Sequence, residues 1–133
     1  AAGPPGRTQL IASAPQAMTE KFPDDGLAWG ALATAAATAS RYELAGPAFE
    51  RWIALAPTDP DAHASQGYFL HLTGDDARAR TVLERGVEQF PAHGNLWMNY
   101  AVVLEALGDA AADDARRKAA ALMTPEQRAT LVR

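Results

Sequence analysis

The stretch Phe22-Pro23-Asp24-Asp25-Gly26-Leu27-Ala28-Trp29 is paralleled further along the chain by Phe90-Pro91-Ala92-His93-Gly94-Asn95-Leu96-Trp97. A middle copy, Ala56-Pro57-Thr58-Asp59-Pro60-Asp61-Ala62-His63, keeps the proline but not the aromatic residues. The prolines of the three copies, and Pro125 after them, are spaced by 34 residues (57−23, 91−57 and 125−91). Self-similarity at a fixed period of this length indicates a repeat architecture, in which each period is one supersecondary unit.

Each period contains two amphipathic stretches of helical length. In the last full period, apolar residues recur at the spacing of one helical face, at Leu96, Tyr100, Val103, Leu104 and Leu107. Gly74-Asp75 and Gly108-Asp109 separate the two stretches, since glycine accepts the left-handed conformation that ends a helix and aspartate caps the next one. The pattern predicts helices, to within two or three residues at each end, over residues 26–39, 43–55, 60–73, 76–89, 94–107 and 110–123.

Small and large residues also keep step with the period. Counted from residues 26, 60 and 94, the three units place them at Trp29, Leu32, Ala33, Ala45, Phe49 and Pro57; at Gly67, Leu70, Gly74, Asp75, Ala79, Leu83 and Pro91; and at Trp97, Ala101, Leu104, Gly108, Asp109 and Pro125. In this pattern the chain closely resembles the tetratricopeptide repeat family. The resemblance implies an all-α fold, an α-α superhelix or right-handed solenoid of about three helix-turn-helix hairpins with flanking half-repeat helices.

We expect residues 1–133 to form a single domain of such repeats. Its expected parts are a flexible tail (1–7), an N-terminal half-repeat (8–23), three repeats (26–59, 60–93 and 94–124) and a C-terminal capping helix (125–133). Pro15 is expected to kink or break the helix of the N-terminal half-repeat. Thr124-Pro125-Glu126-Gln127 has the N-cap, the N1 proline and the capping-box glutamine of a helix start.

Two residues depart from the repeat pattern. His63 stands where the other two copies have tryptophan, and we expect it at the edge of the core. Asp113 stands where the other units have a small alanine. We therefore expect the second helix of the third unit to shift by a residue or two and to turn Ala112 or Ala115 inward.

Composition and charge exclude several classes of partner. The formal net charge is −4 and the pI is near 5.3, whereas nucleic-acid-binding proteins present a basic face, so no nucleic-acid partner is expected. No apolar run reaches the roughly 18 residues of a membrane span, so no membrane insertion is expected. The chain has no cysteine, which excludes disulfides and thiolate chemistry. Abundant alanine and arginine are typical of GC-rich bacterial genomes.

The sequence contains no motif typical of catalysis, metal binding or nucleotide binding. His63 and His71 lie on one predicted helix about 80° out of phase, which is unsuited to a shared metal ion. The acidic doublets 24–25, 75–76 and 113–114 fall at or near helix starts, where carboxylates cap free N–H groups and match the helix dipole. No nucleophile elbow or glycine-rich nucleotide loop occurs. We therefore expect no catalytic residue, no metal ion, no cofactor and no enzymatic activity.

The resemblance also implies where a partner would bind. In this family the first helix of each repeat lines a concave groove, at five places per repeat. Carried over to this sequence, these places are Leu27, Gly30, Thr34, Ala37 and Thr38; Asp61, Ala64, Tyr68, His71 and Leu72; and Asn95, Met98, Val102, Glu105 and Ala106. The candidate partner-binding residues among them are Leu27, Thr34, Asp61, Tyr68, His71, Leu72, Asn95, Met98, Val102 and Glu105.

The charge of this groove limits the ligand. Chaperone-binding members of the family hold the terminal carboxylate of a peptide with Lys, Arg and Asn side chains, yet residues 26–39, 60–73 and 94–107 contain no Lys or Arg. An acidic C-terminal peptide is therefore not expected as ligand. A largely uncharged groove suits an extended apolar peptide or a helix laid into it. The alternative is that the groove, short and rich in small residues, binds nothing tightly.

These observations lead to three functional hypotheses. The first is a scaffold for protein–protein interaction that binds a partner peptide or helix in the groove. The second is an accessory repeat domain of a larger multidomain bacterial protein, either an enzyme or part of an assembly machinery. The third is a self-associating module, a homo-oligomer in which the last helix docks on another copy. The sequence leaves open whether this soluble protein would be cytoplasmic or periplasmic.

Overall fold

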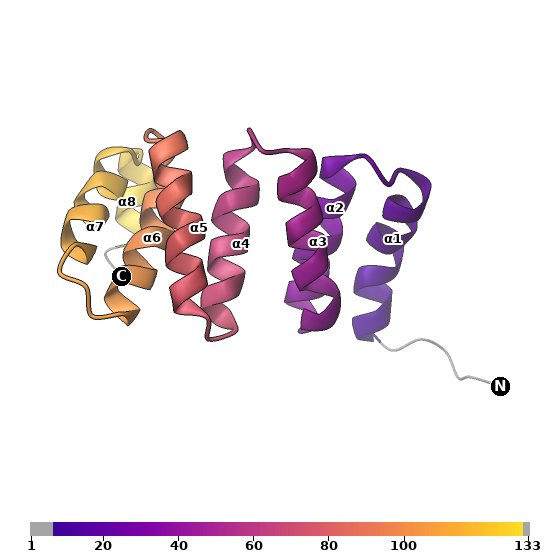
Figure 1. The fold of residues 1–133 in the computed structure, drawn as a ribbon. Helices are drawn as coiled ribbons and strands as arrows, with labels where there is room; N and C mark the ends of the chain where they lie inside the picture. The colour runs from indigo at the N-terminus through magenta and orange to yellow at the C-terminus, as the bar shows by residue number, and fades with distance from the viewer. Residues whose placement is uncertain (1–6, 132–133) are drawn as a thin grey trace. The chain divides into compact units, whose positions relative to one another are not determined.

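The computed structural model describes residues 7–131, which form helices joined by short turns, with no strand among them (Figure 1). The helices, in chain order, are α1 (Arg7–Lys21), α2 (Gly26–Thr38), α3 (Tyr42–Leu55), α4 (Pro60–Leu72), α5 (Asp76–Gln89), α6 (Gly94–Ala106), α7 (Ala112–Ala121) and α8 (Pro125–Leu131). The helices predicted to begin at residues 26, 60 and 94 begin there. Apart from residue 7, the predicted flexible tail lies outside the described residues. None of the described helices combines the length and the apolar character that crossing a membrane requires.

The chain divides into two compact units, Ala1–Ala62 and His63–Arg133. The first unit holds α1, α2, α3 and the first turn of α4, and the second holds the rest of α4 together with α5 to α8. Each unit has its own buried apolar residues, so each is described by itself below.

In the first unit, α2 and α3 form a hairpin whose two helices are in close contact at alanine residues. Ala33 of α2 and Ala45 of α3 are both fully buried, and Leu32 and Phe49 beside them are almost so. Because alanine side chains are short, the two helix backbones can approach closely, and the larger neighbours then fill the space on either side. α1 packs against the other side of α2 (Figure 1).

In the second unit, α4 and α5 form a hairpin whose two helices are in close contact at a glycine. A Cβ atom added at Gly67 of α4 would lie 2.3 Å from Cγ of Leu83 on α5, a side chain with no exposed surface. Leu96 of α6 occupies the space beside Gly86 of α5 in the same way, 2.7 Å from an added Cβ atom. The buried apolar cluster that results consists of Ala64, Leu70, Ala79, Leu83, Val87, Leu96 and Val103.

The second helix of the third repeat is shifted, as expected from Asp113. Ala112 and Ala115 of α7 are buried, at 6% and 2% exposure, and pack with Ala101 and Leu104 of α6, whereas Asp113 is exposed. The expectation that Ala112 or Ala115 turns inward is thus confirmed.

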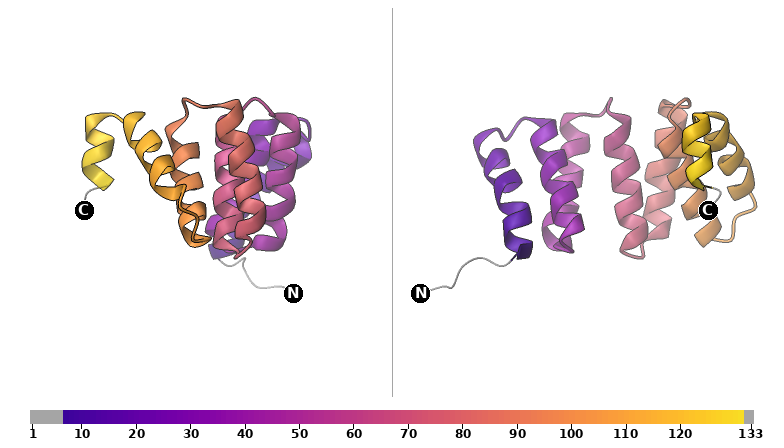
Figure 2. Two further views of the ribbon diagram at one scale, coloured as in Figure 1. Left: turned by 60° about the vertical axis from the view of Figure 1, so that its left-hand side comes forward. Right: turned by 180° about the vertical axis from the view of Figure 1, so that it is seen from behind.

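α7 begins and ends two residues inside the predicted stretch 110–123, within the expected margin of two or three residues, because both ends of the stretch form turns. At the start, Asp109 Oδ1 accepts a hydrogen bond from the Ala111 N–H at 2.9 Å, so the helix begins only at Ala112. At the end, the N–H groups of Leu122 and Met123 bond three residues back, and the helix ends at Ala121. α8 then runs back beside α7 (Figure 2).

The helix starts and stops follow local chemistry. Asp25 and Asp75 cap α2 and α5, accepting from the N–H groups of Leu27 (3.0 Å) and Arg78 (3.2 Å). The capping box before α8 is confirmed: Thr124 N–H donates to Gln127 Oε1 at 2.9 Å and Gln127 N–H to Thr124 Oγ1 at 3.2 Å.

The turns between paired helices share one conformation. Gly74 and Gly108 have φ angles of +87° and +70°, and Ser40, at the corresponding place in the first repeat, has φ of +59°. A serine in this left-handed region costs roughly 1 kcal/mol that glycine avoids. The next residue, Arg41, gives α3 no side-chain cap, whereas Asp75 caps α5. The turn before α3 therefore lacks two devices that stabilise the turn before α5.

Of the two outcomes expected at Pro15, a kink or a break of the helix, the break does not occur. The helix runs from Arg7 to Lys21 with Pro15 inside it. A proline removes one backbone hydrogen bond of the helix, while the turns on either side keep theirs. Packing of α1 against α2 adds stability that the local sequence does not show.

Two tryptophans tie their helices to the preceding loops. The indole Nε1–H of Trp29 donates to the Pro23 carbonyl at 2.8 Å, and that of Trp97 donates to the Pro91 carbonyl at 2.7 Å. The period thus places the same hydrogen bond at the starts of α2 and α6. His63 takes this place in α4; it is half-buried and its ring lies 5.7 Å from that of Phe90, which confirms the prediction of a side chain at the edge of the core.

Replacing Gly67 by Ala is expected to lower the free energy of unfolding by about 1–3 kcal/mol, because the new methyl group would overlap the buried Leu83 side chain. Gly94→Ala is the matched control, since its added Cβ would lie at ordinary contact distance, 3.6 Å from Cβ of Leu122. Urea unfolding of both variants tests the difference. Equal stability of the two would show that α4 and α5 are not in close contact at Gly67.

Burial raises the pKa of the Tyr100 phenol above its ordinary value of 10.0, and the charge of Glu84 adds to the rise, while Arg80 opposes it. Because folding favours the neutral phenol, the stability that Tyr100 contributes is present below pH 10.0 and is lost as the pH rises through its folded-state pKa. Glu84→Gln is expected to lower this pKa, and Glu88→Gln, an exposed residue of the same helix, to leave it unchanged.

The measurement is an ultraviolet titration of phenolate absorbance. Tyr42→Phe and Tyr68→Phe in the background leave Tyr100 as the one tyrosine of the three in the chain. An unchanged titration in Glu84→Gln would contradict the role of its charge.

Candidate functional site

The candidate residues lie on the exposed side of the first helices, α2 in the first unit and α4 and α6 in the second, and in each unit we call this side the first-helix face. None of the ten candidate residues is buried. Seven are exposed, namely Leu27, Thr34, Asp61, Tyr68, Leu72, Asn95 and Glu105, and three are half-buried, namely His71, Met98 and Val102. The structure thus leaves each of them accessible to a partner.

Two further places carried over from the family do not lie on this face. Gly30 is buried beneath the Trp52 indole, and a Cβ atom at Gly30 would lie 2.7 Å from Trp52 Cε2. Ala64 is 5% exposed and belongs to the core of the second unit. Both were assigned to the groove by position within the repeat, whereas the size of the neighbouring side chain decides which residues are covered.

In the first unit, the face contributes little that could bind. Leu27 is 76% exposed at the start of α2. The hydroxyl of Thr34 donates to the Gly30 carbonyl at 2.9 Å, one turn back in the same helix. This bond orients the hydroxyl toward its own helix, so Leu27 is the main apolar contact surface of α2.

In the second unit, the last turns of α4 form an apolar cluster with a polar support. Tyr68 and Leu72 are 44% and 55% exposed. His71 lies between these two residues in the sequence. The centroid of its ring lies 6.1 Å from the centroid of the Tyr68 ring. His71 Nδ1 lies 2.6 Å from Asp76 Oδ1, at the start of α5, and both side chains are about three-quarters buried. This hydrogen bond across the turn fixes the imidazole, and the imidazole supports the tyrosine ring.

α6 lies beside α4 in this unit. The Asn99 side chain of α6 donates from Nδ2 to the Ala64 carbonyl of α4 at 3.1 Å, and Leu96 and Val103 share the α4–α5 core. The exposed residues of α4 and α6 therefore belong to one continuous wall of the second unit.

Positively charged side chains of α7 lie beside this wall. Arg116 pairs with Glu105 of α6 and, at 2.8 Å, with Asp113. Arg116, Arg117, Ala120 and Met98 line a shallow hollow of about 430 Å³. The first helices contain no Lys or Arg, as the sequence shows, but α7 supplies two arginines at the edge of their face. Arg116 is neutralised by its two acidic partners.

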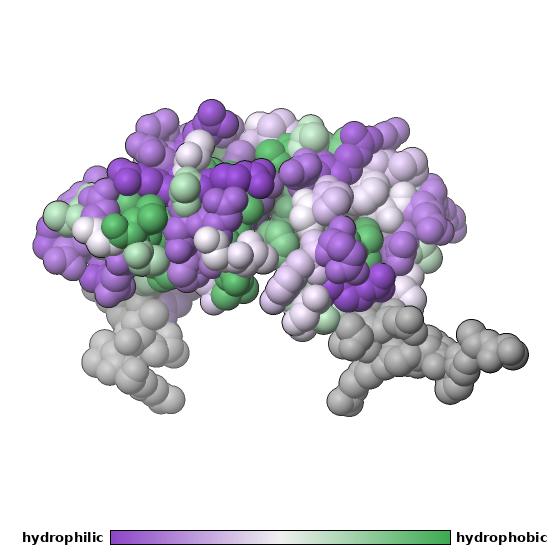
Figure 3. All heavy atoms as spheres, turned by 60° about the horizontal axis from the view of Figure 1, so that its bottom comes forward, coloured by the Kyte–Doolittle hydropathy of each residue, from purple (hydrophilic) through white to green (hydrophobic). Residues whose placement is uncertain are grey.

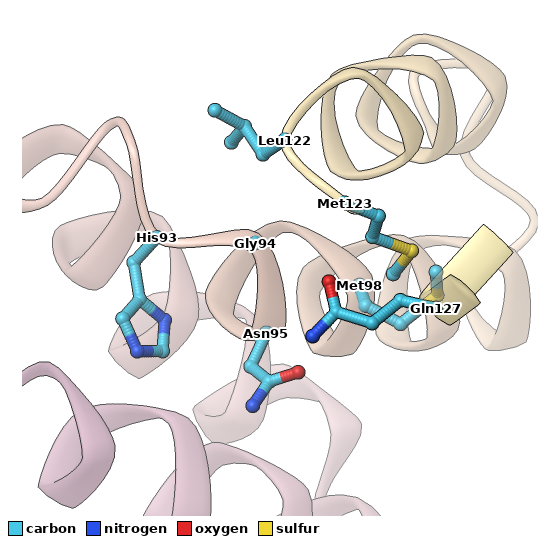
Figure 4. Close-up of a pocket in the computed structure, with 7 residues that line it drawn as sticks. All are labelled: His93, Gly94, Asn95, Met98, Leu122, Met123 and Gln127. Atoms are coloured by element: carbon cyan, nitrogen blue, oxygen red, sulfur yellow. The ribbon is translucent and has the colours of Figure 1, made fainter. Parts of the chain in front are cut away.

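A separate pocket lies where α6 starts, α7 ends and α8 begins. Its volume is about 380 Å³ and its lining residues are His93, Gly94, Asn95, Met98, Leu122, Met123 and Gln127. His93 is the N-cap of α6, with Nδ1 accepting from the Leu96 N–H at 3.3 Å. Figure 4 shows Gln127 projecting its carboxamide from α8 into the space in front of Gly94 and Asn95, with Met98 and Met123 behind it.

On the side of the molecule drawn in Figure 3, apolar surface is distributed in small patches. In Figure 3, the hydrophobic residues on the visible side appear as separate groups between polar ones, and they do not form one continuous stripe. Contact with a partner would therefore combine a few apolar anchors with surrounding polar groups. That is the usual make-up of a non-obligate interface.

Sequence reasoning missed several residues of these sites. It did not place Arg116, Arg117, Met123 or Gln127 beside the first-helix face, and it assigned no role to His93. His93 precedes Gly94 as the N-cap Asp25 precedes Gly26, so the period could have indicated that His93 caps α6. The approach of Arg116 to Glu105 depends on how α7 packs against α6, and no local pattern gives that.

The arrangement can make contacts and hydrogen bonds. Among residues 7–131, no group of three or more His, Asp or Glu side chains is placed to hold a metal ion. Of the acidic doublets, Asp25 and Asp75 are N-caps as expected, whereas Asp24 pairs with Arg51 at 3.3 Å and Asp114 pairs with Lys118 at 3.2 Å.

Two models of the tetratricopeptide repeat family match this chain, one over residues 11–60 and the other over residues 60–103. The chain therefore belongs to the tetratricopeptide repeat family. Its fold class, an all-α solenoid of helical hairpins, is the one that the 34-residue period implied.

Solved structures of similar fold include one titled MamA MSR-1 C2, with a TM-score of 0.72 and 18% sequence identity, covering 93% of this chain and 70% of that chain. A structure of a MamA mutant has a TM-score of 0.67 and 20% identity, covering 87% of this chain and 66% of that chain. At these identities the similarity shows the fold alone. Among curated protein sequences, none matches the chain.

Replacing Asp76 by Ala is expected to lower the free energy of unfolding by about 1 kcal/mol more than Asp113→Ala does. Both residues are acids in the first turn of a helix, so the helix-dipole contribution is matched, but only Asp76 supports a half-buried histidine. Thermal unfolding is measured for these two variants, for His71→Ala and for the double variant His71→Ala with Asp76→Ala. The comparison gives the coupling energy between the side chains of His71 and Asp76. A coupling of zero would contradict a stabilising His71–Asp76 bond.

Proposed function

We propose that this chain is a non-catalytic scaffold that binds an apolar peptide or helix of a partner protein along the first-helix face of its second unit. Membership of the tetratricopeptide repeat family supports an interaction scaffold in general. The observation that carries the more specific proposal is the Tyr68–Leu72 cluster, which exposes a tyrosine and a leucine on one helical turn of α4.

The cluster has the properties of an interface anchor. Tyrosine offers a large, rigid contact surface with a hydroxyl at its end, and such residues carry much of the energy of protein interfaces. The hydrogen bond between His71 and Asp76 fixes the imidazole beside the Tyr68 ring before a partner binds. Ordering the residues in advance reduces the entropy lost on association. A helix with apolar residues at i, i+3 and i+4 would match the spacing of Tyr68 and Leu72.

The charge distribution supports an uncharged contact segment. Glu105 and Arg116 neutralise one another beside the face, and Arg116 is further paired with Asp113. An acidic C-terminal peptide would find no unpaired cation on α2, α4 or α6, because these helices contain neither Lys nor Arg. The proposal therefore excludes such a peptide as the preferred ligand.

The test compares two double variants of equal composition. Tyr68→Ala with Leu72→Ala removes the cluster. Tyr42→Ala with Leu107→Ala removes one tyrosine and one leucine of similar exposure, 44% and 42%, from outside the first-helix face. The wild type and both variants are immobilised, and proteins retained from a lysate of the source cells are compared quantitatively.

A specific partner is expected to be retained by the wild type and by the control variant, and to bind the cluster variant at least about tenfold more weakly. Circular dichroism confirms that both variants are folded. If every retained protein binds the cluster variant as well as the wild type, the first-helix face is not the binding surface.

A further inference from the structure

We propose that α3 has two starting points, Tyr42 and Pro47, and that residues 42–46, the start segment, switch between helix and an open connection. In the structure α3 begins at Tyr42 and has Pro47 inside it. This device belongs to the first unit, so it goes beyond the proposed function, which concerns α4 and α6 of the second unit. It makes the α2–α3 hairpin an element with two states.

The repeat supplies a comparison for the start segment. α3 and α5 both have 14 residues, and each residue of α3 has its counterpart 34 positions later in α5. Ala45 and its counterpart Ala79 both have no exposed surface. Their N–H groups donate, both at 3.0 Å, to the carbonyls of Arg41 and Asp75 respectively. Because the two helix starts share this geometry, a difference in their stability comes from the other residues around them.

The turn before α3 stabilises the start at Tyr42 poorly. Ser40 holds the left-handed conformation with a φ angle of +59°, which Gly74 adopts without a Cβ atom in the turn before α5. Arg41 gives α3 no side-chain cap, whereas the carboxylate of Asp75 caps α5. The N–H groups of the first turn are therefore better satisfied in α5 than in α3.

The turn before α5 also has a side-chain bond that the turn before α3 cannot form. His71 Nδ1 lies 2.6 Å from Asp76 Oδ1, and this bond joins the end of α4 to the start of α5. The counterparts of these two residues are Ala37 and Tyr42. An alanine side chain forms no hydrogen bond, so this pair does not join the end of α2 to the start of α3.

Gly46 and Pro47 weaken α3 at the end of the start segment. Proline has no N–H group, so Pro47 gives no hydrogen bond to the carbonyl of Glu43, four residues earlier. Glycine loses more backbone entropy in a helix than other residues do. The counterparts of the two residues in α5 are Arg80 and Thr81, which have neither property. The start segment is thus joined to the rest of α3 by a weakened stretch of helix.

The same two residues are well suited to begin a helix. Proline is favoured at the first helical position, where its missing N–H is not needed and its φ angle is already helical. Glycine is accepted at the N-cap position before it. With this start, the carboxylate of Glu50 would lie in the first turn, where the helix dipole favours an acid. A helix that begins at Pro47 therefore has local support that the start at Tyr42 lacks.

Opening of the start segment lengthens the connection between α2 and α3. The connection comprises residues 39–41 in the structure, and it would comprise residues 39–46 in the open state. Roughly two to eight residues commonly join paired helices, so both lengths are permitted. Opening exposes the buried Ala45 and the half-buried Leu44, and this loss of apolar burial keeps the closed state the major one. A ligand with different affinities for the two states would shift the balance between them.

The test is amide hydrogen exchange of the full chain, followed residue by residue by NMR. A helix that begins at Pro47 leaves the N–H groups of residues 44–46, 48 and 49 without helical partners, whereas the N–H groups from Glu50 onward keep theirs. Protection from exchange is therefore expected to be uniformly low up to residue 49 and to rise at Glu50.

α5 is the internal control for this measurement. The ratio of protection between residues 51–54 and Ala45 describes α3, and the ratio between residues 85–88 and Ala79 describes α5. The ratio in α3 is expected to be at least about tenfold the larger, because the left-handed serine and the missing cap both favour opening. Ser40→Gly with Arg41→Asp gives the first repeat the turn residues of the second. This variant is expected to raise protection at Ala45 at least about tenfold and to leave the ratio in α5 unchanged.

Two variants of Gly46 separate a second helix start from simple fraying. Gly46→Ala and Gly46→Ser add side chains of similar size, but serine is a good N-cap and alanine is a poor one. With a second start at Pro47, protection at Ala45 is expected to be at least about fivefold lower in Gly46→Ser than in Gly46→Ala. Fraying without a second start gives only the roughly twofold difference that helix propensity produces.

Three results would overturn the proposal. The first is an equal ratio of protection in α3 and α5. The second is a gradual rise of protection along α3 without a step at Glu50. The third is a difference of about twofold or less between the two Gly46 variants. Circular dichroism of each variant establishes that the chain is folded before exchange is measured.

Discussion

The close approach of paired helices at small residues is the constraint on which the rest of the structure depends. Ala33 and Ala45 allow it in the first unit, and Gly67 allows it in the second. Once two helices are this close, the neighbouring large side chains can fill the space on each side at the density of a protein interior. The exposed side of each first helix is then fixed in direction, so packing in the core decides which residues a partner can reach.

Much of the fold could be predicted because its signals are local. The loop prolines, the capping aspartates and the glycines of the turns act within a few residues, and they gave the starts of α2, α4 and α6. Differences from the predicted helices have two kinds of cause. α1 continues through Pro15, where it packs against α2. α7 is two residues shorter at each end than predicted for a local reason, because turns form there.

The site was less predictable, because side-chain length and the packing of second helices decide it. Repeat position assigned Gly30 to the groove, but the Trp52 indole covers it. The count of cations on the first helices was correct, yet it could not show that Arg116 reaches Glu105 from α7. The bond between His71 and Asp76 joins two residues that had been interpreted separately, one as a contact residue and the other as part of a capping doublet. Each of these pairs forms only when two helices are brought together.

The indole bonds of Trp29 and Trp97 have a spectroscopic consequence. Of the three tryptophans in the chain, Trp29 and Trp52 belong to the first unit and Trp97 to the second. Indole emission depends on the polarity around the ring, and the ring of Trp97 also carries the Lys118 ammonium 4.6 Å from its centroid. Replacing Trp29 and Trp52 by phenylalanine would leave emission from the second unit alone, and replacing Trp97 would leave emission from the first. Intrinsic fluorescence can therefore record the melting of each unit separately, without an attached dye.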